Sequence, residues 1–196
     1  MKNDADFKES MLTHDLIYDG KILHVYRDDV KLPDGRKGFR EYCIHGGAVA
    51  VVPLTDENEV VCVRQYRYAL GRVTTEIPAG KLDYVGEDPY SAAMRELREE
   101  TGYTVASLTP IGDLNTTPAL MNEVIHMYLA EKLVPGETDF DDDEFIEIVR
   151  IPLDGLVGMI IRGEILDSKT QAAVLKVWAM KHREAAKAAH MPRSDR

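Results

Sequence analysis

The chain has 196 residues, of which 44% are hydrophobic, and its formal net charge at pH 7 is −10. This length allows one domain with a real core and an additional small lobe. The acidic balance argues against a general nucleic-acid binder, which needs a basic surface. No segment approaches the roughly 18 apolar residues of a membrane span, and the N-terminal stretch MKNDADFKES lacks the apolar run of a signal peptide.

Two cysteines, Cys43 and Cys62, lie in apolar stretches that are typical of strands. A disulfide framework is not expected here, and buried thiols in a reducing compartment explain the pattern better. Together with the lack of a leader or a span, this predicts a cytoplasmic protein with neither a membrane nor a nucleic acid as its partner.

The first 45 residues alternate turn signals with short extended runs, and they predict an antiparallel β lobe with a turn at residues 33–35. Two strands are predicted next, at residues 47–54 and 59–68. The first has a continuous apolar centre, which is typical of a strand buried on both faces. The stretch that follows, residues 69–89, is expected to be a loop.

A helix is predicted from about Pro89 to Thr101. Asp88 can accept a hydrogen bond from the first turn, proline suits that turn, and Gly102 can end the helix.

Strands and helices continue towards the C-terminus. Ser168 and Gln171 have the spacing of a capping box at the start of the last helix, and residues 191–196 are expected to be frayed. The expected elements are strands near 104–108, 124–129 and 146–151, an acidic loop at 135–144, and helices at 153–162 and 168–188. This order indicates an α+β fold or a mixed-sheet sandwich rather than a repeating βαβ pattern.

Three carboxylates, Glu96, Glu99 and Glu100, lie near the end of the predicted helix. A solvated helix face is the ordinary explanation for such a run. However, Glu96 and Glu100 are four residues apart and repel each other, and the helix dipole disfavours anions in the last turn by roughly 0.3–1 kcal/mol. At about 100° per residue, both lie at the edge of the apolar stripe. A divalent cation would resolve the conflict, because Mg²⁺ and Mn²⁺ take oxygen ligands.

The stretch GKLDYVGEDPYSAAMRELREETGY, residues 80–103, resembles the Nudix box. Gly80 and Glu87 are separated by one residue more than in the family pattern. From Glu87 onward the fixed positions are all matched, by Arg95, Glu96, Leu97, Glu99, Glu100, Gly102 and Tyr103. The likeness to ADP-ribose pyrophosphatases of this superfamily covers roughly residues 15–182, including the stretches RQYRYALGRVTTEIPAGKLD, TTPALMNEVIHMYLA, DDDEFIEI and LDSKTQAAVL.

The resemblance implies a Nudix hydrolase domain at residues 46–190, folded as an α/β/α sandwich around a mixed β-sheet. It also implies that the N-terminal lobe, residues 1–45, is exchanged between the subunits of a homodimer. The implied reaction is Mg²⁺-dependent hydrolysis of ADP-ribose to AMP and ribose 5-phosphate, with Mn²⁺ as a substitute metal. Alternatives are hydrolysis of another nucleoside diphosphate compound, such as GDP-mannose or NADH, and a non-catalytic ADP-ribose sensor. Sensors usually lose box glutamates, and this chain keeps them.

Family resemblance also suggests which residues hold the metal. The first Glu of Arg-Glu and the last Glu of Glu-Glu are Glu96 and Glu100 here, and the carbonyl before the box glycine belongs to Ala79. Glu99 is a lesser candidate for an outer or third-metal ligand. Arg95 is expected to brace the helix and the loop before it.

Four residues are candidates for binding substrate. The family assigns Arg67 to the diphosphate, which suits the bidentate guanidinium, although a solvated arginine at a strand end fits the sequence equally well. Arg40 and Glu41 match a pair that in relatives reaches across the dimer towards substrate. Glu76 either braces the loop or contacts the ribose.

The reaction also needs a general base to orient and deprotonate water, and the box glutamates are committed as ligands. Glu144 is the expected base, because similar pyrophosphatases carry a loop glutamate at this place. Glu123, which opens the strand near 124–129, is the alternative.

Overall fold

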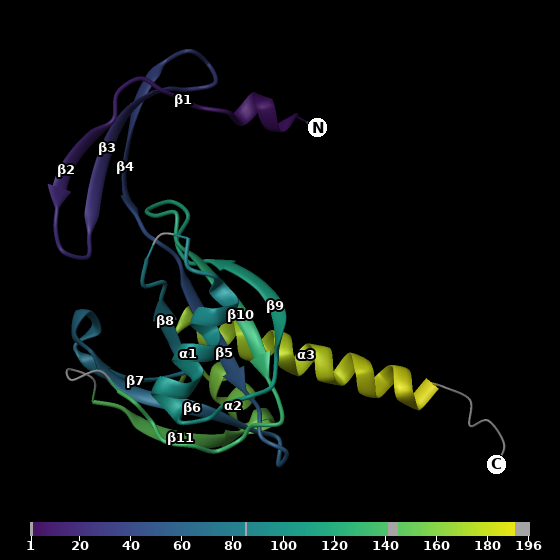
Figure 1. Ribbon diagram of the computed structural model, residues 1–196. Coiled ribbons are helices and arrows are strands. Elements are labelled where there is room, and N and C mark those ends of the chain that lie inside the picture. Colours follow the sequence, from purple (N-terminus) through teal and green to yellow (C-terminus); the bar gives the residue numbers. More distant parts are fainter. Residues whose placement is uncertain (1, 85, 141–144, 191–196) are drawn as a thin grey trace. The chain divides into compact units, whose positions relative to one another are not determined.

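A computed structural model describes residues 2–84, 86–140 and 145–190, with side chains described as far as Arg183 (Figure 1). The described residues divide into two compact units. The first unit is Met1–Gly46 with Asn115–Glu123, and the second is Gly47–Leu114 with Val124–Arg196. No helix in the described part of the chain is both long enough and apolar enough to cross a membrane.

The first unit is an antiparallel β lobe, as predicted. The central strand β3 (His24–Lys31) pairs with β1 (Ser10–Met11), β2 (Asp15–Asp19) and β4 (Lys37–Ile44), after a short 3₁₀ helix at Asp4–Phe7. The turn expected at residues 33–35 is confirmed: the Arg36 carbonyl accepts from the Leu32 N–H at 2.8 Å, and Gly35 has a φ of 88°.

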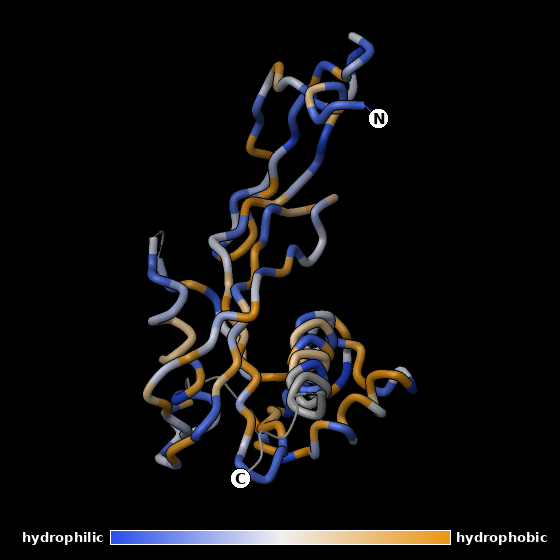
Figure 2. Tube along the Cα trace, turned by 90° about the vertical axis from the view of Figure 1, so that its right-hand side faces the viewer, coloured by the Kyte–Doolittle hydropathy of each residue, from blue (hydrophilic) through white to orange (hydrophobic). Residues whose placement is uncertain are grey.

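The segment at 115–123 joins this lobe through β4. The Cys43 N–H donates to the Leu120 carbonyl at 2.8 Å, and the His45 N–H donates to Oδ1 of Asn122 at 2.8 Å. Few side chains are buried here: among the described residues of the first unit, only Asp28 and Val30 are. Figure 2 shows that hydrophobic stretches nevertheless occur along the lobe.

The second unit contains two sheets. One has the order β8-β5-β10-β9 and combines a parallel β5–β10 pair with an antiparallel β5–β8 pair. The other has the order β11-β6-β7 and is antiparallel. The strands are β5 (Ala48–Pro53), β6 (Glu59–Arg67), β7 (Arg72–Glu76), β8 (Ala79–Lys81), β9 (Leu108–Asn115), β10 (Val124–Ala130) and β11 (Glu147–Pro152).

Three helices cover the mixed sheet on both faces: α1 (Pro89–Thr101), α2 (Leu153–Ile161) and α3 (Ser168–His190). The side chains of β5 alternate between two cores, because successive residues of a strand point to opposite faces. Ala48, Ala50 and Val52 pack in one core with residues of α2 and α3, and Val49 and Val51 pack in the other with residues of α1. The predicted α/β/α sandwich with a mixed sheet is therefore confirmed.

Helix α1 has the predicted bounds and ends. Asp88 accepts a hydrogen bond from the Ser91 N–H at 3.1 Å, and Gly102 has a left-handed φ of 72° while its N–H donates to the Arg98 carbonyl at 2.8 Å. Both cysteines are free, with Cys62 buried and Cys43 partly exposed. Burial raises the pKa of the Cys62 thiol to about 12, so this thiol is unreactive.

Three local predictions were wrong. Residues 69–89 are not a single loop, because the β-branched run Val73–Thr75 pairs with β6 and Ala79–Lys81 pairs with β5. The strand expected near 104–108 lies instead at Leu108–Asn115, where its edge position tolerates Pro110 and the positive φ of Gly112.

The third concerns the start of α3, which Asp167 caps in place of Ser168. The Asp167 carboxylate accepts from both the N–H and the hydroxyl of Thr170, at 2.9 and 2.6 Å. The side chain of Gln171, expected to complete a capping box, donates instead to the Ile165 carbonyl at 2.8 Å.

Candidate active site

Two glutamates of α1 lie against strand β8. Glu100 is only 3% exposed, and its carboxylate accepts a hydrogen bond from the Ala79 N–H at 2.9 Å. Glu96 lies so close to Gly80 that a Cβ built on this glycine would be 2.0 Å from the glutamate's carboxyl carbon. The position at the edge of the core that helical spacing predicted for both carboxylates is therefore confirmed.

Gly80→Ala should displace the Glu96 carboxylate, since no Cβ fits at this distance. The obstructing atoms are the end of a flexible side chain, so we expect thermal stability to change little. Activity should fall by roughly 10²-fold, because displacement of a catalytic group by about 1 Å can have that effect. Steady-state rates and a thermal melt test this, with Gly155→Ala in α2 as the control, because a Cβ there would make only ordinary contacts at 3.8 Å or more. An unchanged rate in Gly80→Ala would contradict a role for Glu96.

Arg95 holds this end of the helix to the segment before it. Its Nη1 lies 2.8 Å from Glu96 and 3.1 Å from Glu99, and its Nη2 lies 3.2 Å from Asp83 and 3.5 Å from Glu87. Burial alone would lower the pKa of Arg95, but these carboxylates raise it above the ordinary value. Arg95 thus braces the helix as expected and offsets part of the repulsion between the glutamates.

Glu99 is engaged by two arginines of α1. Its carboxylate pairs with Arg95 and, at 3.4 Å, with Arg98, which also lies 3.2 Å from Asp139. The Asp139 N–H donates to the Glu99 carbonyl at 3.0 Å. The Glu99 carboxylate is therefore engaged by two arginines of its own helix, whereas that of Glu100 accepts a hydrogen bond from the backbone of β8.

The donor set at this end of α1 suits a hard cation. Glu96, Glu100 and the Ala79 carbonyl offer only oxygens, the ligands that Mg²⁺ takes. Within residues 2–84, 86–140 and 145–190, no three His, Cys, Asp or Glu side chains converge into a complete metal cage. Mg²⁺ needs no such cage, since it commonly binds one or two carboxylates and completes its shell with waters and phosphate oxygens. The residues therefore fit a Mg²⁺ ion that is shared with substrate.

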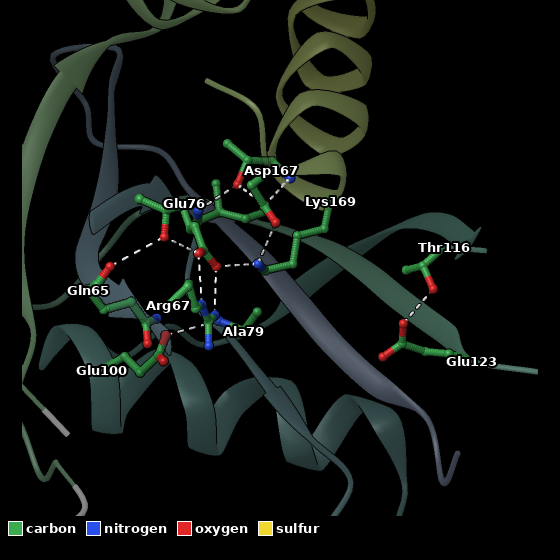
Figure 3. Close-up of polar contacts among 12 residues, drawn as sticks. Gln65, Arg67, Glu76, Ala79, Glu100, Thr116, Glu123, Asp167 and Lys169 are labelled. Atoms are coloured by element: carbon green, nitrogen blue, oxygen red, sulfur yellow. Dashed lines mark hydrogen bonds and ion pairs between the residues drawn. The ribbon is translucent and has the colours of Figure 1, made fainter. Parts of the chain in front are cut away.

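A second cluster centres on Glu76, at the end of β7, which is 2% exposed. Arg67 grips both of its oxygens, with Nε at 2.9 Å and Nη2 at 2.7 Å, and Thr74 donates from its hydroxyl at 2.6 Å. Lys169, from the first turn of α3, also donates to Glu76 (Figure 3). Burial alone would raise the pKa of Glu76, but its bonds to Arg67 and the charge of Lys169 hold the value at about 2.

The depressed pKa of Glu76 makes a specific contribution to stability. The ordinary value is 4.5 and the folded value about 2, so the ionised form favours folding by about 3 kcal/mol. This contribution is complete above pH 4.5 and is lost as the pH falls towards 2. Urea unfolding between pH 7 and pH 3 should therefore show a steeper loss of stability for the wild type than for Glu76→Gln. Parallel curves for the two proteins would contradict this prediction.

Arg67 connects the two clusters. Figure 3 shows its guanidinium between the carboxylates of Glu76 and Glu100, and the side chain remains 41% exposed. The hydrogen bonds that Arg67 donates to Glu76 raise the pKa of Arg67, with a further contribution from the charge of Glu100. A half-exposed guanidinium, held by Glu76 and close to the carboxylate of Glu100, is placed to contact an anion that approaches this end of α1.

Three predicted site residues belong to the first unit. Glu123 accepts from the Thr116 hydroxyl at 2.5 Å and lies 3.6 Å from Nδ1 of His45. Arg40 donates to the Phe39 carbonyl at 2.7 Å and also pairs with Glu9. Glu41 is exposed on β4. Glu144 lies outside the described residues.

The sequence of the chain matches the model of the NUDIX domain at residues 44–171 and that of the nucleoside diphosphate sugar hydrolase N-terminal domain at residues 15–42. An ADP-ribose pyrophosphatase of Bacillus subtilis is 40% identical over 169 residues, covering 85% of this chain and 91% of that protein. A methanol dehydrogenase activator of Bacillus methanolicus is 41% identical over 170 residues, covering 86% and 91%.

The chain belongs to the Nudix family. A solved structure supports the fold: a crystal structure of an ADP compounds hydrolase has a TM-score of 0.78 at 23% identity, covering 93% of this chain and 96% of that chain.

The candidate site of this Nudix protein includes residues that the sequence did not single out. Lys169 and Asp167 complete the Glu76 cluster, with Nζ of Lys169 at 2.9 Å from Asp167. In the sequence, both residues lie in the stretch LDSKT. This stretch resembles relatives but contains no motif that predicts a catalytic or binding role.

Proposed function

We propose that this Nudix protein is a Mg²⁺-dependent hydrolase that splits the diphosphate of ADP-ribose, or of a related ADP-sugar, and releases AMP and ribose 5-phosphate from ADP-ribose. The observation that carries the proposal is the arrangement of Glu96 and Glu100 against β8, with Arg67 beside Glu100. A carboxylate pair backed by a guanidinium is the combination that an anionic diphosphate and its cation require.

Each residue has a distinct role in this proposal. Glu96, Glu100 and the Ala79 carbonyl would hold the metal, and Glu99 is an outer ligand. A bound Mg²⁺ would neutralise charge that develops on the diphosphate. Arg67 binds a phosphate oxygen and fixes the reacting bond, while Glu76 keeps the guanidinium in place.

The attacking water needs a base, and we assign this role to Glu144. The assignment rests on the sequence alone. Glu123, the alternative, already shares its two oxygens between Thr116 and His45. These contacts favour Glu123 as a residue that holds local structure over one that receives a proton.

The assembly that we propose is a homodimer in which the N-terminal lobe is exchanged. Small sheets need a covered apolar face for stability, and this lobe leaves large apolar side chains at least half exposed, among them Met11, Ile17, Tyr18, Ile22 and Phe39. A second copy of the chain would cover them and would bring Arg40 and Glu41 to the substrate of its partner. The free thiols of Cys43 and Cys62 are the reason for placing the protein in the cytoplasm.

Arg40→Ala should weaken substrate binding without preventing assembly. Loss of one charge-assisted hydrogen bond, worth about 1.5–3 kcal/mol, should raise KM by roughly tenfold or more. Arg36→Ala is the matched control, because Arg36 pairs with its near neighbour in sequence, Asp34, at 2.6 Å. Light scattering at micromolar concentration should show a dimer for all three proteins. A fully active wild-type monomer would contradict the proposed assembly.

The substrate is tested by hydrolysis of a panel. ADP-ribose, GDP-mannose and NADH are compared at equal concentration with Mg²⁺, and kcat/KM is determined for each. We expect the highest value for ADP-ribose. A higher kcat/KM for GDP-mannose or NADH would make that compound the assigned substrate. Binding of ADP-ribose without any hydrolysis would support the sensor alternative.

A further inference from the structure

Lys169 is buried in an unfavourable place. It is 8% exposed and lies in the first turn of α3, where the helix dipole disfavours a cation. A buried ammonium is costly unless it is paired. Its partners are Asp167, at 2.9 Å from Nζ, and Glu76. The pairing with Asp167 offsets the dipole locally, but it does not explain why the ammonium also reaches β7.

Lys169 is connected to Arg67 through the carboxylate of Glu76. The carboxylate of Glu76 accepts hydrogen bonds from the guanidinium of Arg67 and from the ammonium of Lys169 (Figure 3). The hydroxyl of Thr74 adds a further donor at 2.6 Å. The Glu76 carboxylate thus has fixed partners from β6, β7 and α3, and it can turn only if these bonds break.

The charges of the cluster also indicate that Lys169 affects the binding of an anion by Arg67. The cluster has two cations, Arg67 and Lys169, and two carboxylates, Glu76 and Asp167, so its four side chains carry no net charge. Asp167 lies on the Lys169 side of this group, while Arg67 is its half-exposed end. Without Lys169 the remaining three side chains would carry a net charge of −1 and would attract an anion less.

We propose that Lys169 is a positioning residue: by anchoring Glu76 to α3, it directs the guanidinium of Arg67 towards the diphosphate of the substrate, and its charge balances one of the two carboxylates beside it. Lys169 itself does not touch the substrate. The inference rests on the proposed function, because it requires that Arg67 bind a phosphate group.

A double-mutant cycle tests this inference with inorganic pyrophosphate and Mg²⁺ as the probe. Calorimetry measures the Kd of pyrophosphate for the wild type, Arg67→Ala, Lys169→Met and the double variant. Lys169→Met should weaken binding by roughly tenfold, the effect of about 1.4 kcal/mol. In the Arg67→Ala background the same change should alter Kd by less than about twofold, because residues that act through one contact are not additive.

Two further variants separate positioning from general stability. Lys181→Met removes a lysine of the same helix that pairs with the partly exposed Glu131, and it should leave Kd within about twofold of the wild type. Lys169→Arg keeps the charge and should restore most of the affinity. If Lys169→Met does not fold, Lys169→Gln takes its place, since an amide can still donate to Glu76 but carries no charge.

The outcomes are distinct. Any of three results would overturn the inference. The effects of Arg67→Ala and Lys169→Met on Kd could multiply in the double variant, or the Kd of pyrophosphate could be unchanged in Lys169→Met or in Arg67→Ala. Hydrolysis of ADP-ribose by the wild type is measured separately. If that hydrolysis is absent but the cycle shows coupling, the proposed function fails while the role of Lys169 at an anion site stands.

Discussion

Replacing Glu100 by Gln should lower the turnover of ADP-ribose at saturating Mg²⁺ by roughly 10²-fold or more. Glutamine keeps the size of the side chain and an oxygen that can accept from the Ala79 N–H, so the fold should remain intact. What is lost is the negative charge that would hold the metal against the diphosphate. Glu96→Gln should have an effect of similar size, because its carboxylate lies against Gly80 on the same strand.

Glu99→Gln is the matched comparison on the same helix. Its carboxylate is engaged by Arg95 and Arg98, so its loss should reduce turnover less than that of either neighbour. Initial rates over a Mg²⁺ titration, together with thermal melts of each variant, separate metal binding from unfolding. Near-normal rates in both Glu96→Gln and Glu100→Gln would show that the metal is held elsewhere.

Glu144→Gln should lower turnover by roughly 10²–10⁴-fold, the usual range for loss of a general base. Substrate binding should change little, because this residue is assigned to the water and not to the ligand. The effect should appear in kcat at saturating ADP-ribose and Mg²⁺, and the dependence of kcat on pH should lose its acidic limb.

Glu123→Gln is measured beside it under the same conditions. We expect a much smaller change in kcat, because Glu123 is occupied by Thr116 and His45. A small effect at Glu144 together with a large one at Glu123 would transfer the role of base to Glu123.

The sequence predicted those parts of the fold that depend on local signals. Helix α1 begins after Asp88 and ends at Gly102 because a capping carboxylate and a left-handed glycine are local requirements. The burial of Glu100 at the edge of the core likewise follows from helical spacing alone. The continuous apolar run of β5 predicted a strand covered on both faces, as found.

The remaining features depend on partners that are distant in the sequence. Strand β8 has three residues, too few for a recognisable alternation, and it exists because it pairs with β5. Lys169 and Glu76 are 93 residues apart, so no local pattern connects them. A buried ion pair of this kind is visible only when the tertiary structure brings α3 to β7.

The most direct test of the account is the reaction itself. The wild-type protein, first treated with a chelator, is incubated with ADP-ribose with and without added Mg²⁺, and the products are separated by chromatography. We predict equal amounts of AMP and ribose 5-phosphate, formed only when Mg²⁺ is present. Cleavage at the same rate without a divalent metal, or no cleavage of ADP-ribose with Mg²⁺ present, would contradict it.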